Sequence, residues 1–238
     1  MVLLLGAGRG LGQSLLRFFL DRQIPVSCVT RTQASSDTLR SEVAGDRGSL
    51  LFSEAFDLAD RASSDAFVER LLSRSGSAGF PVLAIYAAGF LAGRSSLFHE
   101  AMSDIDREIA VNFTIPLYWS CALSRHFMRF GKGGHLFISS GVARTMRPHW
   151  GAYGVAKGAL ESLAAQLSID LPAPHYSLSI NPGGMATEMR RLAYPEEDPG
   201  TLPSPEEIGR KIGRLCLLLM EGQGREYNGK RLQMGDLP

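Results

Sequence analysis

The stretch Val2-Leu-Leu-Leu-Gly6-Ala-Gly-Arg-Gly10-Leu-Gly12 decides the fold of this 238-residue chain. An apolar run of strand length leads into a glycine-rich turn, and residues 11–22 then show the spacing of apolar side chains that is typical of a helix. Backbone N–H groups at the start of such a helix can bind a pyrophosphate, and glycine lets the phosphate approach closely. A turn of this kind can also be purely structural. Its spacing is G-x-x-x-G-x-G, which differs from the common dinucleotide pattern G-x-G-x-x-G.

The rest of the chain repeats this alternation of strand and helix. Short apolar runs with the character of buried strands lie at residues 2–5, 25–30, 49–52, 81–86, 134–139 and 176–180, with a candidate last strand at 231–234. Helical spacing occurs at residues 11–22, 37–43, 60–73, 102–130, 152–171 and 204–221. This order predicts a doubly wound α/β fold (Rossmann-like), with a parallel sheet covered by helices on both faces, as a single domain over residues 1–238.

Composition narrows the class of partner. The chain has 25 Lys and Arg against 24 Asp and Glu, and no long run of like charges indicates nucleic-acid or membrane-surface binding. No apolar stretch approaches the roughly 20 residues of a membrane span. The three cysteines and five histidines lack the spacing of disulfide or metal sites. We therefore expect a cytoplasmic protein that acts on a small molecule and binds no metal.

Ser140, Tyr153 and Lys157 form a second informative pattern. Ser140 follows the predicted strand at 134–139, and the other two residues are one helical turn apart on one face. Such a trio suits proton transfer to or from a substrate oxygen while hydride moves: Tyr153 carries the proton, Lys157 lowers the pKa of the phenol, and Ser140 positions the oxygen. A Tyr-x-x-x-Lys pair alone is more often an ordinary surface pair. Its position beside a strand end at the ligand-binding edge of the sheet favours the catalytic interpretation.

The end of the second predicted strand indicates which dinucleotide would bind. An NAD site normally has a carboxylate there, whereas this chain has Val29-Thr-Arg-Thr32. Arg31 and Arg9 can pair with a 2′-phosphate through charge-assisted hydrogen bonds, unless both are ordinary solvated arginines. The sequence therefore predicts NADP(H) as the preferred cofactor, with NAD(H) as the alternative.

Taken together and in this order, the motifs resemble the short-chain dehydrogenase/reductase family over nearly the whole chain. The family's other motifs match Asp57 and Leu58, Ala87-Ala-Gly89, Asn112 and Asn181-Pro-Gly-Gly-Met-Ala-Thr187. The resemblance implies that Asp57 contacts adenine, that Lys157 also binds the nicotinamide ribose, and that Asn112 supports a water-linked proton path. The predicted cofactor-binding residues are Gly6, Gly8, Arg9, Gly10, Leu11, Gly12, Arg31, Asp57, Leu58, Ala87, Ala88, Gly89, Tyr153, Lys157, Pro182, Gly183, Met185 and Thr187, and the predicted catalytic residues are Ser140, Tyr153, Lys157 and Asn112.

Several positions leave alternatives open. Leu5 stands where many members of that family have threonine, and Tyr86-Ala87 stand where asparagines are common, so side chains that brace the cofactor floor are missing. An asparagine inside a helix, such as Asn112, often satisfies a local backbone group instead. Residues 184–203 are either a substrate loop or ordinary surface.

The resemblance implies an NADPH-dependent oxidoreductase that reduces a ketone or aldehyde to an alcohol, or the reverse, in a homodimer or homotetramer. The alternative is a catalytically silent NAD(P)-binding sensor or regulatory protein on the same fold. An isomerase or dehydratase is a further alternative. The sequence does not name the substrate.

Overall fold

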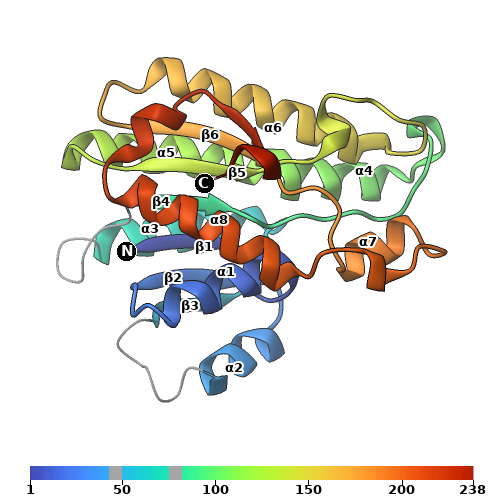
Figure 1. The fold of residues 1–238 in the computed structure, drawn as a ribbon, viewed down its shortest axis with the longest axis horizontal. Helices are drawn as coiled ribbons and strands as arrows, with labels where there is room; N and C mark the ends of the chain where they lie inside the picture. The colour runs from blue at the N-terminus through green and yellow to red at the C-terminus, as the bar shows by residue number, and fades with distance from the viewer. Residues whose placement is uncertain (43–49, 75–81, 238) are drawn as a thin grey trace.

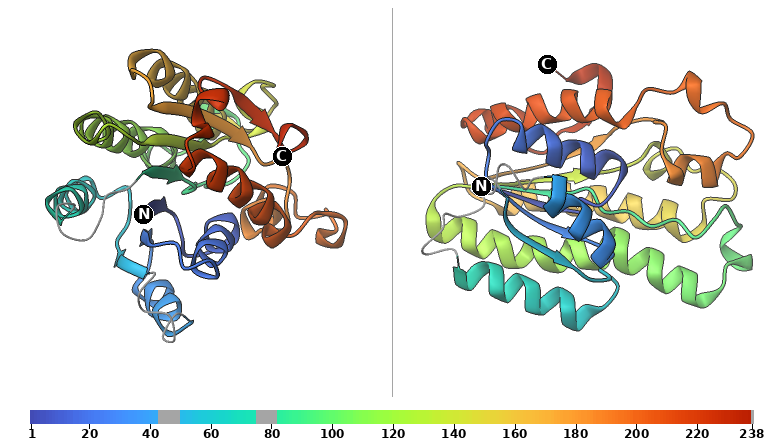
Figure 2. Two further views of the ribbon diagram at one scale, coloured as in Figure 1. Left: turned by 60° about the vertical axis from the view of Figure 1, so that its left-hand side comes forward. Right: turned by 90° about the horizontal axis from the view of Figure 1, so that it is seen from below.

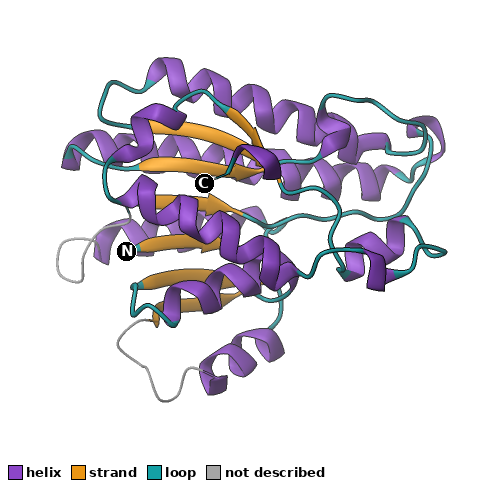
Figure 3. Ribbon diagram, in the orientation of Figure 1, coloured by secondary structure: helices purple, strands orange, loops and turns teal. Residues whose placement is uncertain are grey.

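The computed structural model describes residues 1–42, 50–74 and 82–237 (Figure 1). Seven strands form one parallel sheet in the order β3-β2-β1-β4-β5-β6-β7 (Figure 3). Their bounds are β1 Val2–Leu5, β2 Val26–Thr30, β3 Leu50–Ala55, β4 Leu83–Tyr86, β5 Gly134–Ile138, β6 Tyr176–Asn181 and β7 Arg231–Gln233. The predicted Rossmann-like fold is confirmed, and each of the predicted strands overlaps an observed one; residues 49 and 81 lie outside the described residues.

Helices cover both faces of the sheet (Figures 1 and 2). Their bounds are α1 Gly10–Leu20, α2 Gln33–Glu42, α3 Arg61–Arg74, α4 Met102–Ile109, α5 Ile115–Phe130, α6 Gly151–Asp170, α7 Glu188–Ala193 and α8 Pro205–Met220. Helices α1 and α8 pack on one face, and α3, α5 and α6 pack on the other. The part of the chain that the structure describes contains no helix long and apolar enough to cross a membrane.

The side chains of β1 point alternately to the two faces of the sheet, which explains why there is an apolar cluster on each face. Val2 and Leu4 belong to the apolar cluster with α1 and α8, whereas Leu3 and Leu5 belong to the cluster with α3, α5 and α6. All four side chains are buried, because a central parallel strand meets helices on both sides. Burying each such leucine stabilises the fold by about 1.5–3 kcal/mol. Leu5 therefore serves the core at the position where the resemblance suggested a missing threonine.

Tyr86 also has a structural explanation. Its hydroxyl lies 3.1 Å from Nδ1 of buried His135, whose Nε2 lies 2.9 Å from the Ser124 hydroxyl. Its ring stacks on Phe137 with ring centroids 4.4 Å apart. The polar atoms are thus satisfied inside the core, as buried hydroxyl and imidazole groups require. The tyrosine braces β4 against β5 rather than contacting a ligand through its side chain.

Three predicted element bounds differ from the structure. The single helix predicted at 102–130 is interrupted by a π-turn at Ala110–Thr114, which separates α4 from α5. Residues 184–203, predicted as a loop, contain the short helix α7, whose first turn is capped by the Thr187 hydroxyl on the Arg190 N–H. Helix α2 begins at Gln33 rather than at residue 37, and residue 43 lies outside the described residues.

Candidate active site

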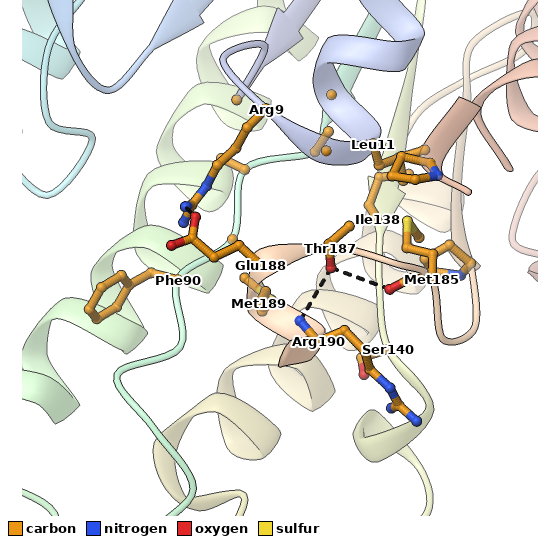
Figure 4. Close-up of a pocket in the computed structure, with 18 of the residues that line it drawn as sticks. Arg9, Leu11, Phe90, Ile138, Ser140, Met185, Thr187, Glu188, Met189 and Arg190 are labelled. Atoms are coloured by element: carbon orange, nitrogen blue, oxygen red, sulfur yellow. Dashed lines mark hydrogen bonds and ion pairs between the residues drawn. The ribbon is translucent and has the colours of Figure 1, made fainter. Parts of the chain in front are cut away.

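A cavity of about 900 Å³ opens at the carboxyl ends of the strands. All the predicted cofactor-binding residues line it, and so does Ser140; Asn112 does not. The glycine turn, the ends of β4, β5 and β6, and helix α7 form its walls (Figure 4). The structure thus brings together segments that are far apart in the sequence, as expected for the carboxyl edge of a doubly wound sheet.

Glycine is required in the turn after β1. Gly6 and Gly10 have φ values of +86° and +56°, which favour glycine. A side chain at Gly6 would place its Cβ 2.6 Å from Cα of Ala88, and one at Gly12 would lie 1.9 Å from the Gly6 carbonyl oxygen. The bare backbone of this turn faces the cavity at the start of α1, which is the geometry that a bound pyrophosphate needs.

The first turn of α2 and the residue before it supply two hydroxyls next to Arg31. The Thr32 and Ser35 hydroxyls lie 2.9 Å apart, and the Ser35 N–H donates to Thr32 Oγ1 over 3.2 Å. Arg31, Thr32 and Ser35 all line the cavity, and Arg31 is exposed. Cationic and hydroxyl donors therefore lie together at this end, which suits a phosphate group.

Arg9 lies in the same turn but has a partner that the sequence did not suggest. Its guanidinium forms an ion pair with Glu188 at the start of α7 (Figure 4). Both side chains are more than half exposed, so the pair is a weak surface interaction. It connects the glycine turn to α7 across the cavity.

The predicted trio lies together on the far side of the glycine turn. Ser140 follows β5, and its side chain lies near the Tyr153 hydroxyl, whose pKa it lowers. Lys157 Nζ donates to the Ile138 carbonyl oxygen over 3.0 Å and lies 5.7 Å from the centroid of the Tyr153 ring. Tyr153 and Lys157 are both buried, at 6% and 3% exposure. A buried phenol, an ammonium and a hydroxyl therefore converge at one point of the cavity wall.

The direction of one expected pKa shift is wrong. Burial raises the pKa of Tyr153 to about 12, and the hydrogen bond from Ser140 opposes this only in part. Burial lowers the pKa of Lys157 to about 8, against the effect of nearby Glu161. The sequence suggested that the lysine would lower the pKa of the phenol, but the loss of hydration dominates and the charge of Glu108 raises this pKa further. At neutral pH the pair is thus a neutral phenol and an ammonium, the state of a proton donor.

Asn112 lies in the π-turn and holds the loop that follows β4. Its Nδ2 donates to the carbonyl oxygens of Phe90 (2.7 Å) and Glu108 (2.9 Å), and its Oδ1 accepts from the Phe90 N–H (3.2 Å). These contacts match the alternative that the amide satisfies local backbone groups. Its part in a proton path stays a prediction.

Asp57 is held by a residue that sequence reasoning missed. Arg107 Nη2 donates to Asp57 Oδ2, and Asp57 Oδ1 accepts from the Ala59 N–H over 3.0 Å. Arg107 also lies over the Phe90 ring and lines the cavity. No sequence signal joins Asp57 to a helix 50 residues further along the chain.

Two further carboxylates were missed, and both reach the start of α6. Glu100 Oε2 accepts from the Ala152 N–H over 3.0 Å, and the Glu108 carboxylate lies near the Tyr153 N–H, whose dipole lowers the pKa of the carboxyl. The first N–H groups of a helix lack partners within the helix, so these acids satisfy them. The sequence did offer one signal for Glu108: it lies four residues before Asn112, so the two residues share a helix face.

The end of the cavity beyond Tyr153 is apolar and aromatic. Tyr153 packs in a small cluster with Val142, Ala193, Trp150 and Tyr194. The Trp150 ring centroid lies 5.6 Å from that of Tyr153 and 6.0 Å from that of Tyr194. These residues line the cavity, so α7 and its flanks contribute to the site rather than to ordinary surface.

Comparison with known proteins shows which family this architecture matches. The family model for short chain dehydrogenases matches residues 1–198. The oxidoreductase YciK of Escherichia coli (strain K12) is 35% identical over 51% of this chain and 46% of its own length. The (S)-benzoin-forming benzil reductase of Bacillus subtilis (strain 168) is 25% identical over 97% of this chain and 98% of its own. The first match thus spans about half of the relative, and the second spans almost all of it.

Solved structures show the same fold. A short chain dehydrogenase from Pseudomonas syringae superposes with a TM-score of 0.86 at 28% identity, covering 98% of this chain and 93% of that one. A short chain dehydrogenase from Shigella flexneri complexed with NADP superposes with a TM-score of 0.87 at 23% identity, covering 98% and 96%.

The buried ammonium predicts how stability depends on pH. The pKa of Lys157 is about 8 in the folded chain and 10.5 for an ordinary lysine, so between these values the unfolded chain holds a proton that the folded chain lacks. The free energy of unfolding therefore rises with pH in this window. We expect Lys157→Met to be more stable than wild type at pH 7, with an advantage that shrinks by up to about 3 kcal/mol toward pH 10.5.

Urea unfolding at pH 7, 8.5 and 10 measures this difference. Lys132→Met, at an exposed lysine, is the control and should show no such narrowing. A gap between Lys157→Met and wild type that stays constant with pH would contradict the assignment of a desolvated ammonium.

Proposed function

Because the chain belongs to the short-chain dehydrogenase family, we propose that this oxidoreductase uses NADPH to reduce a ketone or aldehyde to an alcohol, or runs the reverse reaction. The observation that carries the proposal is the buried contact of the Tyr153 phenol with Ser140, beside the ammonium of Lys157. When bound, the nicotinamide supplies hydride to the carbonyl carbon. The residues of this chain manage the oxygen and the proton.

The proton chemistry follows from the protonation states. Ser140 donates to the substrate oxygen and holds it at the phenol, and Tyr153 transfers its proton to that oxygen as charge develops there. Lys157 lies next to the phenol, and its positive charge stabilises the phenolate that the transfer leaves behind. Solvent returns the proton to Tyr153. In the reverse direction the phenolate takes the proton from the alcohol.

Several features of this chain fit NADPH. The bare glycine turn accommodates a pyrophosphate, and Asp57, held by Arg107, lies where the resemblance puts adenine. Arg31 and the Thr32 and Ser35 hydroxyls suit the 2′-phosphate that distinguishes NADPH from NADH. The NADP-bound Shigella flexneri structure and an Escherichia coli CFT073 structure complexed with NADPH have the same fold, which supports this choice.

The apolar end of the cavity favours an aromatic carbonyl compound. Trp150, Tyr194 and Met189 form faces against which a planar ring can stack, and Arg190 lies 3.9 Å from the Tyr194 ring centroid, so that this ring is held. The Bacillus subtilis relative is a benzil reductase, and benzil has two flat aromatic rings of the kind that these faces can stack against. Benzil is therefore the first substrate to test.

Replacement of the proton donor tests the reaction. Tyr153→Phe keeps the ring but removes the hydroxyl, so we expect kcat for benzil with NADPH to fall by at least about 100-fold, the usual contribution of a positioned acid. NADPH binding, measured by fluorescence titration, should change less than threefold. Turnover at the wild-type rate would show that another group donates the proton, and NADPH binding without turnover of any carbonyl compound by the wild type would favour the sensor.

Removal of one cation tests the choice of cofactor. Arg31→Ala should raise the Kd for NADPH by at least about tenfold, because a charge-assisted contact contributes roughly 1.5–3 kcal/mol, and should leave the Kd for NADH nearly unchanged. Arg210→Ala, at an exposed arginine of α8 outside the cavity, is the matched control. Equal losses for the two cofactors at Arg31 would contradict a 2′-phosphate contact.

Truncation of the indole tests the substrate class. Trp150→Ala should lower kcat/KM for benzil by about tenfold, since one aromatic wall contributes roughly 1.4 kcal/mol of binding, and should change kcat/KM for a small aliphatic diketone by less than threefold. Leu192→Ala changes a half-exposed residue of α7 outside the cavity lining and is the control. The same loss for both substrates would show that Trp150 shapes the fold of the site and does not select aromatic groups.

A further inference from the structure

Glu108 is a buried carboxylate close to the reaction site that the proposed mechanism does not use. It lies in the last turn of α4, is 1% exposed, and does not line the cavity. A carboxylate is rarely buried so completely, because burial removes its hydration. Its contacts must therefore offset that cost.

These contacts connect three parts of the site. Glu108 Oε1 accepts from the Ala92 N–H over 2.7 Å, and the carboxylate lies near the Tyr153 N–H, whose dipole lowers the pKa of the carboxyl. Its backbone carbonyl accepts from Asn112 Nδ2, which also donates to the Phe90 carbonyl oxygen. Glu108 and Asn112 thus hold the loop after β4 at two points, while Glu108 alone reaches the first turn of α6.

The contact with α6 differs from ordinary helix capping. Glu100 takes the Ala152 N–H at the rim, where its side chain is only partly buried. Glu108 lies on the buried side of the start of α6, near the backbone N–H of Tyr153, which carries the phenol. The second carboxylate oxygen of Glu108, Oε2, has no hydrogen-bond partner among the described residues.

The charges around Glu108 are acidic. Burial is the main cause that raises its pKa to about 7, and Glu100 and Asp104 raise it further, while the two N–H groups oppose the shift. The adjacent Arg107 is engaged with Asp57. The charge of Glu108 in turn raises the pKa of Tyr153. The carboxylate is therefore linked to the phenol both by its position near the Tyr153 backbone N–H and by charge.

We propose that Glu108 is a positioning residue of the reaction, whose carboxylate fixes the phenol-bearing end of α6 against the loop after β4. This inference rests on the proposed role of Tyr153 as the proton donor. The ionised carboxylate attracts both N–H groups more strongly than the neutral acid does. Its charge also makes Tyr153 a weaker acid. The gain in positioning exceeds this opposing effect, so turnover rises with pH as Glu108 ionises near neutrality, and this group gives the acid limb of the pH–rate profile.

Two variants separate the charge from the contacts. Glu108→Gln keeps the shape and an acceptor oxygen but cannot ionise, so kcat should fall about fivefold and the acid limb should disappear. Glu108→Met removes both acceptors, so kcat should fall at least about 30-fold. Glu108→Asp keeps an ionisable group and should retain an acid limb. The Kd for NADPH should stay within threefold of wild type in all three.

A spectroscopic signal reports on the phenol without turnover. Ultraviolet difference titration follows phenolate formation, and Tyr153→Phe identifies which part of the signal belongs to Tyr153. Loss of the negative charge in Glu108→Gln should lower the pKa of Tyr153 relative to wild type. Glu100→Gln, which alters the neighbouring cap, should lower the melting temperature and leave the Tyr153 titration in place. It should keep an acid limb, displaced to lower pH because Glu100 no longer raises the pKa of Glu108.

The outcomes distinguish this inference from the proposed function. If Glu108→Gln keeps the wild-type acid limb and the wild-type titration of Tyr153, Glu108 is purely structural and the inference is overturned, even where Tyr153→Phe is inactive. If Tyr153→Phe retains full turnover, the proposed function fails. The ultraviolet titration of Tyr153 in the wild type and in Glu108→Gln still shows whether Glu108 affects the pKa of the phenol. Should Glu108→Met not fold, Glu108→Gln alone decides through the two pH measurements.

Discussion

The close approach of bare backbone at Gly6, Gly12 and Ala88 is the constraint on which the rest of the structure depends. Any side chain at Gly12 would meet the Gly6 carbonyl oxygen, and one at Gly6 would meet the segment that leaves β4. This contact holds the start of α1 close to the end of β1, and it fixes where the loop after β4 begins. That loop continues to Phe90 and Ala92, which are held from α4 and its π-turn, and through them the position of the turn is transmitted to the start of α6.

Two carboxylates, buried Glu108 and partly buried Glu161, act in opposite directions on the proton-transferring pair. Glu161, one turn after Lys157, favours the ammonium, and it is itself held by Ser139 and by Arg231 at 2.5 Å. Glu108, behind Tyr153, disfavours the phenolate. Together they keep the lysine charged and the tyrosine neutral before reaction. The site is thus set by a balance between burial, which strips hydration from both groups, and fixed charges that lie just outside the cavity wall.

The sequence predicted most of the fold because each buried strand is a short apolar run and each long helix is amphipathic. It predicted the cavity residues because glycines, Arg31 and Ser140 occur at strand ends, where the topology brings them together. The π-turn was missed because one inserted residue barely changes the apolar period, and α7 because it is only six residues long. The pKa of Tyr153 and the contacts of Glu108 depend on burial and on distant segments, which no local pattern encodes. The single-domain boundaries, the homodimer or homotetramer, the cytoplasmic location and the proton path through Asn112 stay predictions.

Helix α7 and the proton-handling residues belong to separate parts of the chain. Tyr153, Lys157 and Ser140 are supported by the core of the sheet, by α4 and by α6, whereas Met189, Ala193 and Tyr194 come from one short segment attached at the rim. Mutations in that segment can alter the shape offered to a substrate without disturbing the core beneath. Evolution can therefore change what this scaffold accepts while it keeps how the scaffold reacts, and a designer who seeks a new specificity can randomise the residues of α7 other than Ala193, which packs with Tyr153, and leave the chemistry in place.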